Sequence, residues 1–117
     1  MLPKKYRLSG YQVSQTFKKG RFFNAPLFTL KFLPLKNISP DFKNSLFSIT
    51  VPLKVEKKAV RRNKIRRQVY EIIRHLLPEL KSGWAIAILA KKEILNKTYQ
   101  QMEEEIKISF KKIQILS

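Results

Sequence analysis

Apolar residues recur every three or four positions in two segments of the chain, which is the spacing of an amphipathic helix. The first helix is expected over about residues 57–77, with an apolar stripe formed by Ile65, Val69, Ile72, Ile73 and Leu76. The second is expected over about residues 97–114, capped by Asn96, with a stripe formed by Tyr99, Met102, Ile106, Phe110 and Ile113. Both stripes are typical of helices that pack against a core.

A shorter helix is expected near the N-terminus, over residues 10–19. Ser9 would cap its start and Gly20 would end it. Val13 and Phe17 lie one turn apart and therefore share a face of this helix.

Alternation of apolar and polar residues predicts the strands. In residues 27–33, Phe28, Leu30 and Phe32 face the core, whereas Thr29 and Lys31 face the other way. In residues 45–51, Leu46, Ser48 and Thr50 are expected on one side of the strand, and Phe47, Ile49 and Val51 on the other. Residues 84–90 are almost continuously apolar, as expected in the middle of a sheet. A short strand is expected at Phe22 and Phe23.

This order of elements predicts an α+β fold built on one sheet. The chain contains no repeat and no linker, so residues 1–117 are expected to form a single domain. We expect the helices to cover one face of the sheet. The other face, with Thr29 and Lys31, would then be open to a partner.

Positive charge changes the interpretation of the longer basic helix. Within residues 54–67 there are eight cationic side chains and one acid, Glu56. Several cations repel each other at i,i+4, and those in the first turns oppose the helix dipole. A solvated surface would mix both signs, so this pattern favours binding to a polyanion. The whole chain has 25 Lys and Arg against 8 Asp and Glu, a net charge of +17, which indicates nucleic acid before an acidic membrane.

Several other classes of protein are disfavoured by composition. The longest apolar run has seven residues, too few to span a bilayer, and the N-terminal segment lacks the apolar core of a signal peptide, so the cytoplasm is the expected compartment. The chain has no cysteine, one histidine (His75) and scattered acids. We find no convergent carboxylates for a two-metal nuclease and no pair of nucleophile and base. No catalytic residue and no metal ligand is therefore assigned to the protein.

The basic segment resembles the protein subunit of bacterial ribonuclease P. That family carries Lys-Lys-X-Gly-X-Ala-Val-X-Arg-Asn-Arg-X-Lys-Arg between a strand and its second helix, and this chain matches it at Ala59-Val60, Arg62-Asn63 and Arg67. Further matches are Arg7-Leu8, Phe17-Lys18-Lys19-Gly20 and Ala90-Lys91. Glu56-Lys57-Lys58 stands in place of the family's Gly-X, so the start of the helix is expected to differ.

The resemblance implies an α-β-β-β-α-β-α domain with a four-stranded mixed sheet and a left-handed β-α-β crossover, against the usual right hand. It implies that a catalytic RNA subunit, with Mg²⁺ held mainly by that RNA and the substrate, removes the 5′ leader of precursor tRNA. No organic cofactor, membrane or obligate protein partner is expected. The residues assigned to RNA binding are Lys54, Lys57, Lys58, Arg61, Arg62, Asn63, Lys64, Arg66, Arg67, Arg7 and Lys91. The residues assigned to a cleft for the leader are Val13, Phe17, Thr29 and Lys31.

Two alternatives remain open at this point. The chain could be a small ribosomal or RNA-architectural protein without a part in catalysis, or an autonomous nuclease, which the scattered acids disfavour. Phe17 could stack on a leader base or pack in the core.

Overall fold

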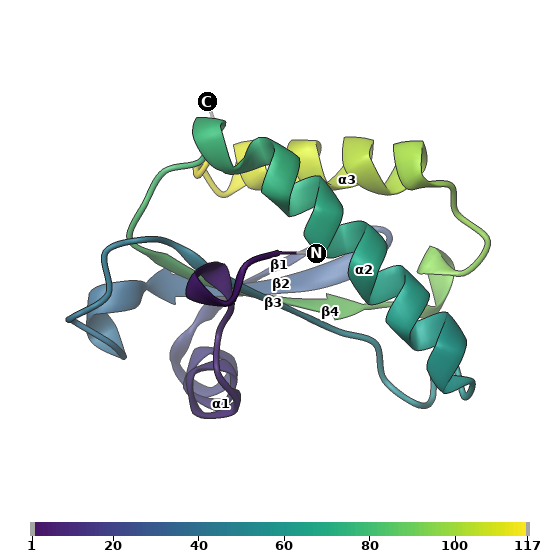
Figure 1. Cartoon of the computed structure of the whole chain (residues 1–117), viewed down its shortest axis with the longest axis horizontal. Helices are drawn as coiled ribbons and strands as arrows, with labels where there is room; N and C mark the ends of the chain where they lie inside the picture. Colours follow the sequence, from purple (N-terminus) through teal and green to yellow (C-terminus); the bar gives the residue numbers. More distant parts are fainter. Residues whose placement is uncertain (1, 117) are drawn as a thin grey trace.

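The computed structural model describes residues 2–116 and has the predicted order of elements (Figure 1). These elements are α1 (Gly10–Lys19), β1 (Arg21–Asn24), β2 (Phe28–Pro34), β3 (Leu46–Thr50), α2 (Ala59–Leu76), β4 (Trp84–Ala90) and α3 (Tyr99–Lys112). The α+β class and the α-β-β-β-α-β-α order are therefore confirmed. In the described part of the chain, no helix has both the length and the apolar character needed to cross a membrane.

The four strands form one mixed sheet in the order β1-β2-β4-β3. Strand β2 is antiparallel to both of its neighbours, whereas β3 runs parallel to β4. Strand β4 is central, as its continuous apolar sequence predicted. Helix α2 makes the connection between the two parallel strands, and the left hand of this crossover stays an expectation from the resemblance.

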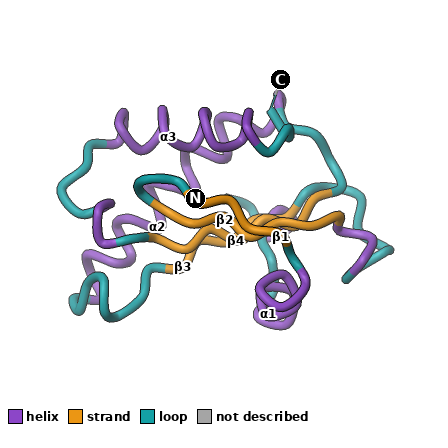
Figure 2. The backbone as a smooth tube through the Cα atoms, turned by 180° about the vertical axis from the view of Figure 1, so that it is seen from behind, coloured by secondary structure: helices purple, strands orange, loops and turns teal. Residues whose placement is uncertain are grey.

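The helices lie on both faces of the sheet, so the prediction that they cover one face is wrong. Figures 1 and 2 show α2 and α3 on one side and α1 alone on the other. The reason lies in the strands, which carry apolar residues on both faces. Behind the main core, Val13 and Phe17 of α1 pack against a second buried cluster formed by Leu8, Leu33, Leu35, Leu46, Ala85 and Ala87.

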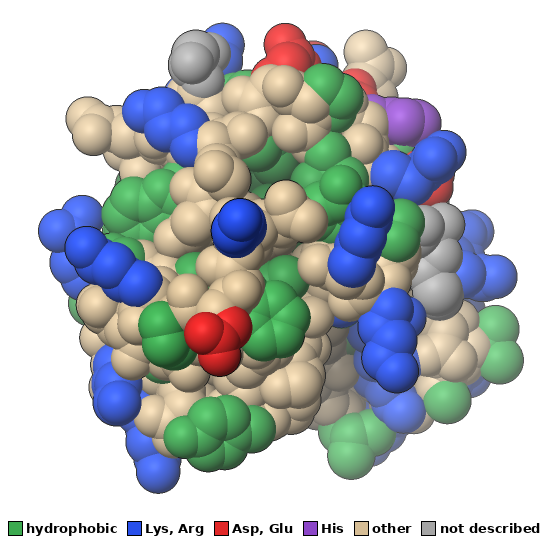
Figure 3. Space-filling model, turned by 60° about the vertical axis from the view of Figure 1, so that its left-hand side comes forward, with side chains coloured by type: hydrophobic (Ala, Val, Ile, Leu, Met, Phe, Trp, Pro, Cys, Tyr) green, Lys and Arg blue, Asp and Glu red, His purple; other side chains and the backbone are tan. Residues whose placement is uncertain are grey.

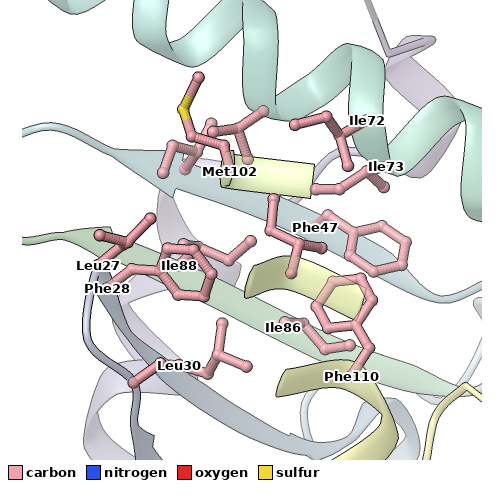
Figure 4. Close-up of a cluster of buried hydrophobic side chains, with 14 of the residues drawn as sticks. Leu27, Phe28, Leu30, Phe47, Ile72, Ile73, Ile86, Ile88, Met102 and Phe110 are labelled. Carbon is pink, nitrogen blue, oxygen red and sulfur yellow. The ribbon is translucent and has the colours of Figure 1, made fainter. Parts of the chain in front are cut away.

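The main core lies between the sheet and the pair α2 and α3 (Figure 4). It contains the predicted stripes of both helices, and Ile72, Ile73 and Phe110 are fully buried. The rings of Phe47 and Phe110 pack with their centroids 6.1 Å apart. The alternation predicted for β2 is also confirmed, because Phe28, Leu30 and Phe32 are buried on this side.

The helix starts differ from the sequence expectation in two places. Thr98, not Asn96, caps α3, and its side chain forms a reciprocal capping box with Gln101. Asn96 instead has a φ of 67°, in the left-handed region that Asn tolerates better than most residues. Helix α2 begins at Ala59, two residues later than predicted, and in the preceding turn the Glu56 side chain accepts a hydrogen bond from Lys58 N (3.1 Å).

The outer edge of β3 is protected by two contacts. Leu8 N donates a hydrogen bond to Phe47 O (2.8 Å), which attaches the N-terminal arm to the strand. Ile49 N donates to the hydroxyl of Tyr70 in α2 (3.3 Å). Because exposed strand edges invite pairing with other chains, these contacts also limit self-association.

Candidate nucleic-acid interfaces

The first half of α2 presents cations on almost every side. Ile65 is the only buried residue between Ala59 and Arg67. The exposed cations here and in the preceding loop are Lys54, Lys57, Lys58, Arg61, Lys64 and Arg67. The first turn contains no acid, and the N-cap residue Lys58 makes no side-chain cap. These cations have no folding role that would explain their number.

Glu56 does little to neutralise this charge. Its carboxylate lies 3.7 Å from Arg61 Nη1, and the Arg61 side chain is 65% exposed. An ion pair at such an exposed position is weak, because water and salt screen it. The positive potential at this end of α2 is therefore available to a ligand. Figure 3 shows that blue Lys and Arg side chains greatly outnumber red acidic ones over another side of the molecule as well.

Arg62 has a structural role that the sequence did not reveal. Its Nη1 donates hydrogen bonds to the carbonyl oxygens of Lys57 (2.7 Å) and Glu56 (3.1 Å). The side chain therefore fastens the entry loop to the helix. Arg62 holds the neighbouring cations in place in addition to any contact it makes itself.

Four of the predicted RNA-binding residues meet beside the N-terminal arm. Arg66 donates a hydrogen bond to the side chain of Asn63 on the same helix. Together with Arg7 and Arg67, they line a surface hollow of about 560 Å³, whose other residues are Val60 and Tyr70. The structure thus brings Arg7, distant in sequence, next to the basic helix.

Lys91 lies on a different part of the surface. Its Nζ donates to Ala25 O (2.5 Å) and its N donates to Leu27 O (2.9 Å), so it fixes the loop between β1 and β2. It lines a hollow of about 340 Å³ in which it meets Lys54 and Lys92. Lys92 was not predicted, because nothing in the sequence shows that the end of β4 lies beside the turn that follows β3.

The predicted leader cleft lies beside α1, on its face of the sheet. The strand register places Ser48, Ala87, Lys31 and Phe22 in one row across the four strands. The neighbouring row is formed by Leu46, Ala85 and Leu33, which belong to the second cluster that packs against α1. Thr29 lies in the following row, where its hydroxyl is 3.3 Å from Asn24 Oδ1. The four predicted cleft residues, Val13, Phe17, Thr29 and Lys31, are therefore on the same side of the sheet and are all partly exposed.

Phe22 adds an exposed aromatic ring to the same row, which the sequence analysis did not assign to the predicted cleft. Its ring is 67% exposed, and the Nζ of Lys31 lies 5.5 Å from the ring centroid. Alternation within Arg21–Asn24 was a usable signal, because only one of two adjacent phenylalanines can face the core. Phe23 packs against the main core, which leaves Phe22 on the cleft side. Phe17, in contrast, is half-buried against the second cluster and contributes to packing.

Ser48 adds a polar group to the same row. The residue is 6% exposed, and its Oγ has no hydrogen-bond partner among the described residues. Buried hydroxyls normally have a partner.

Gly20 sets how closely α1 approaches the sheet. Its N donates to Thr16 O (2.9 Å), which ends the helix. A Cβ at this position would lie 2.5 Å from Thr16 O and 3.1 Å from Phe32 O. Only glycine fits here without moving the main chain, which gives a physical reason for the Phe-Lys-X-Gly segment.

The acidic groups with an altered pKa lie at the other end of α2. A side-chain hydrogen bond from Arg74 (3.0 Å) lowers the pKa of Glu71, and His75 Nε2 is 3.2 Å from the same carboxylate. Burial, followed by the nearby Glu103, raises the pKa of Tyr99, whose hydroxyl is 3.5 Å from His75 Nδ1. Across residues 2–116, no three His, Cys, Asp or Glu side chains come together to hold a metal ion.

Comparisons with known proteins show which family this chain is similar to. The family model described as "Ribonuclease P" matches residues 2–114. A ribonuclease P protein component of Cyanothece sp. is 32% identical and aligns over 99% of this chain and 98% of its own length. That of Microcystis aeruginosa is 34% identical over 91% of this chain and 88% of its own.

Solved structures show the same fold. The RNase P protein of Thermotoga maritima superposes with a TM-score of 0.78 at 26% identity, over 92% of this chain and 97% of that one. The RNase P protein of Staphylococcus aureus superposes with a TM-score of 0.82 at 21% identity, over 96% of this chain and 98% of that one.

Proposed function

The chain belongs to the ribonuclease P protein family, and we propose that it serves as the protein subunit of a cytoplasmic ribonucleoprotein that removes the 5′ leader of precursor tRNA. In this proposal the chemistry belongs to a catalytic RNA subunit. Mg²⁺ would be held by that RNA and by the substrate, because the described protein residues offer no convergent carboxylates. The protein contributes binding and positioning.

The observation that carries the proposal is the unbalanced charge of α2. Its first turn has no acid and no side-chain cap, although either would stabilise the helix. The fold is therefore less stable than it could be, and a polyanion compensates when its phosphates pair with these cations. We assign this surface to the catalytic RNA. Binding then releases counterions and must weaken as salt rises.

The cleft beside α1 is the proposed site of the leader. Phe22 supplies an exposed aromatic face and Lys31 a cation beside it, which together suit a base and its phosphate. A single-stranded segment fits such a surface, because its bases are free to stack.

Cleavage of precursor tRNA tests the whole proposal. At physiological Mg²⁺, cleavage should require both this protein and a cognate catalytic RNA. Cleavage by the protein alone would indicate an autonomous nuclease. Binding to the RNA without any effect on cleavage would indicate an architectural protein.

The leader assignment has its own test. Phe22→Ala and Lys31→Ala should weaken binding of precursor tRNA by the assembled enzyme about fivefold or more, since one stacked base contributes about 1–3 kcal/mol. Binding of mature tRNA should stay unchanged. Phe17→Ala should show the same selectivity together with a lower melting temperature, because its ring also packs in the second cluster. Equal losses for both tRNAs in folded variants would remove the leader from this face.

A further inference from the structure

We propose that the catalytic RNA also binds a second part of the protein, a groove that runs from the basic half of α2 past Arg7 to Phe42. We call it the arm groove, because the N-terminal arm forms its floor. The inference rests on the proposed function and extends the RNA footprint beyond α2. It concerns residues that the sequence pattern did not single out, namely Lys4, Lys5, Phe42 and Tyr70.

The groove consists of two hollows that share residues. The first is the hollow of about 560 Å³ beside Asn63, Arg66 and Arg67. The second has a volume of about 590 Å³ and is lined by Lys4, Lys5, Arg7, Leu8, Ser9, Gln12, Phe42 and Tyr70. Because Arg7 and Tyr70 line both, the two hollows adjoin. A chain bound along α2 can therefore continue to the start of α1 without leaving the protein surface.

The lining of the arm groove carries charge of one sign only. Its cations are Lys4, Lys5, Arg7, Arg66 and Arg67, and no acid lines either hollow. Asp41 neighbours Phe42 in the sequence but is not among the lining residues. Concave surfaces with one sign of charge concentrate the field, so this groove favours a polyanion over a neutral or cationic partner.

Arg7 provides an atom that lacks a partner at the junction of the hollows. Its main chain is fixed, because Arg7 N donates to Lys4 O (3.0 Å) and the next residue is bonded to β3. Its Nε is buried and finds no acceptor among the described residues. Because Arg7 lines both hollows, a phosphate bound at their junction would pair with its guanidinium.

Phe42 offers an aromatic surface at the far end of the groove. The residue is 52% exposed in the loop between β2 and β3. This loop is held in place, since Phe42 N donates to Ser39 O (3.1 Å) and Gln12 of α1 donates to the Ser39 hydroxyl (2.9 Å). An exposed ring on a fixed loop next to cations is the combination on which unpaired RNA bases stack.

The position of the arm groove on the protein indicates which RNA binds there. The arm groove continues the α2 surface assigned to the catalytic RNA, through Arg66 and Arg67. The proposed leader site involves different residues, with Phe22 on the edge strand β1 and Lys31 on β2, whereas the N-terminal arm is bonded to β3 at the opposite edge of the sheet. We therefore assign the arm groove to the catalytic RNA and not to the leader.

The experiment compares matched variants of the full chain. The double variant Lys4→Ala/Lys5→Ala removes two exposed cations from the groove, and Lys111→Ala/Lys112→Ala removes two exposed cations from the last turn of α3. Phe42→Ala is matched by Ile108→Ala, because both side chains belong to residues that are 52% exposed. Affinity for the catalytic RNA is measured without tRNA over a range of salt concentrations, and the affinity of the assembled enzyme for leader-bearing tRNA is measured separately. Melting temperatures show that each variant is folded.

We expect the groove variants to bind the catalytic RNA at least about fivefold more weakly and the controls to bind within about twofold of the unmodified protein. The Lys4→Ala/Lys5→Ala variant should also lower the salt slope by about one unit or more. Groove variants that match their controls would overturn the inference. So would a loss seen only with leader-bearing tRNA, which would assign the groove to the leader. If the unmodified protein fails to bind the catalytic RNA, the proposed function itself is wrong.

Discussion

Helices α2 and α3 cover the same face of the sheet, yet their charges are arranged in opposite ways. Helix α3 begins with a capping box, carries Glu103–Glu105 in its first half and ends with Lys111 and Lys112, all of which suit the helix dipole. Helix α2 begins without a side-chain cap and with cations in its first turns. Both bury an apolar stripe in the same core. The difference shows that helix-end electrostatics does not favour the first half of α2 as a helix, which supports the proposal that its surface binds a polyanion.

The largest expected effect comes from a substitution in the hydrophobic core that α2 and α3 share. Phe110 is fully buried and packs against Phe47, so Phe110→Ala should lower the free energy of unfolding by about 3–5 kcal/mol. Urea denaturation measures this loss. Binding of the catalytic RNA by the fraction that stays folded should be unaffected. A loss of RNA affinity in that folded fraction would mean that α3 itself contributes to the interface.

The next largest effect concerns RNA affinity, which we assign to the surface of α2 and not to α3. Replacing Arg61, Lys64 and Arg67 together with Ala should weaken binding to the catalytic RNA by about 100-fold or more, because each lost phosphate contact is worth about 1 kcal/mol or more. The free energy of unfolding should change by less than about 0.5 kcal/mol, since all three are exposed. Filter binding and urea denaturation check the two quantities. Unfolding of this variant with its RNA affinity intact would show that the cations are structural.

A smaller effect distinguishes two arginines of α2, Arg62 and Arg67. Arg62→Ala should lower both RNA affinity and stability, the latter by about 1–2 kcal/mol, because two carbonyl oxygens lose their charged donor. Arg67→Ala should lower RNA affinity alone. Comparing the melting temperatures of these two single variants tests the distinction. Equal melting temperatures would show that the Arg62 hydrogen bonds contribute nothing to the fold.

The smallest effect concerns the caps. Lys58→Ser places a capping side chain at the start of α2, whose N-cap already has extended geometry, and should stabilise the protein by about 1 kcal/mol while weakening RNA binding slightly. Thr98→Ala removes the cap of α3 and should destabilise the protein by about the same amount with no effect on RNA. Thermal unfolding measures both. If Lys58→Ser destabilises the protein, the Lys58 side chain stabilises the loop before α2 by more than the new cap contributes.

Much of the fold followed from periodicity. The alternation in β2 placed Phe28, Leu30 and Phe32 correctly, and the continuous apolar run of β4 correctly predicted the centre of the sheet. The position of α1 did not follow, because a pair such as Val13 and Phe17 does not indicate which sheet face it covers. The second apolar face was hard to recognise because at its centre it is built from small residues, Ala85 and Ala87.

The candidate sites were predictable only in part. The cations of α2 could be assigned to binding from composition alone, because folding does not explain their number. The double role of Arg62 could not be predicted, because its acceptors are main-chain oxygens that any sequence would supply. Phe22 and Lys92 reach their surfaces through strand register and through the approach of distant loops, which composition does not encode. Thr98 was missed although Thr98 and Gln101 have the spacing of a capping box.

The close approach at Gly20 has a consequence for how the proposed leader site can vary. A Cβ at this position would meet main-chain oxygens of Thr16 and Phe32, so the residue that joins α1 to β1 has to be glycine unless the main chain moves. Main-chain atoms, and not side chains, therefore set the separation between the end of α1 and β2. In the proposed function, preference for one leader over another then depends on exposed side chains such as Phe22 and Lys31.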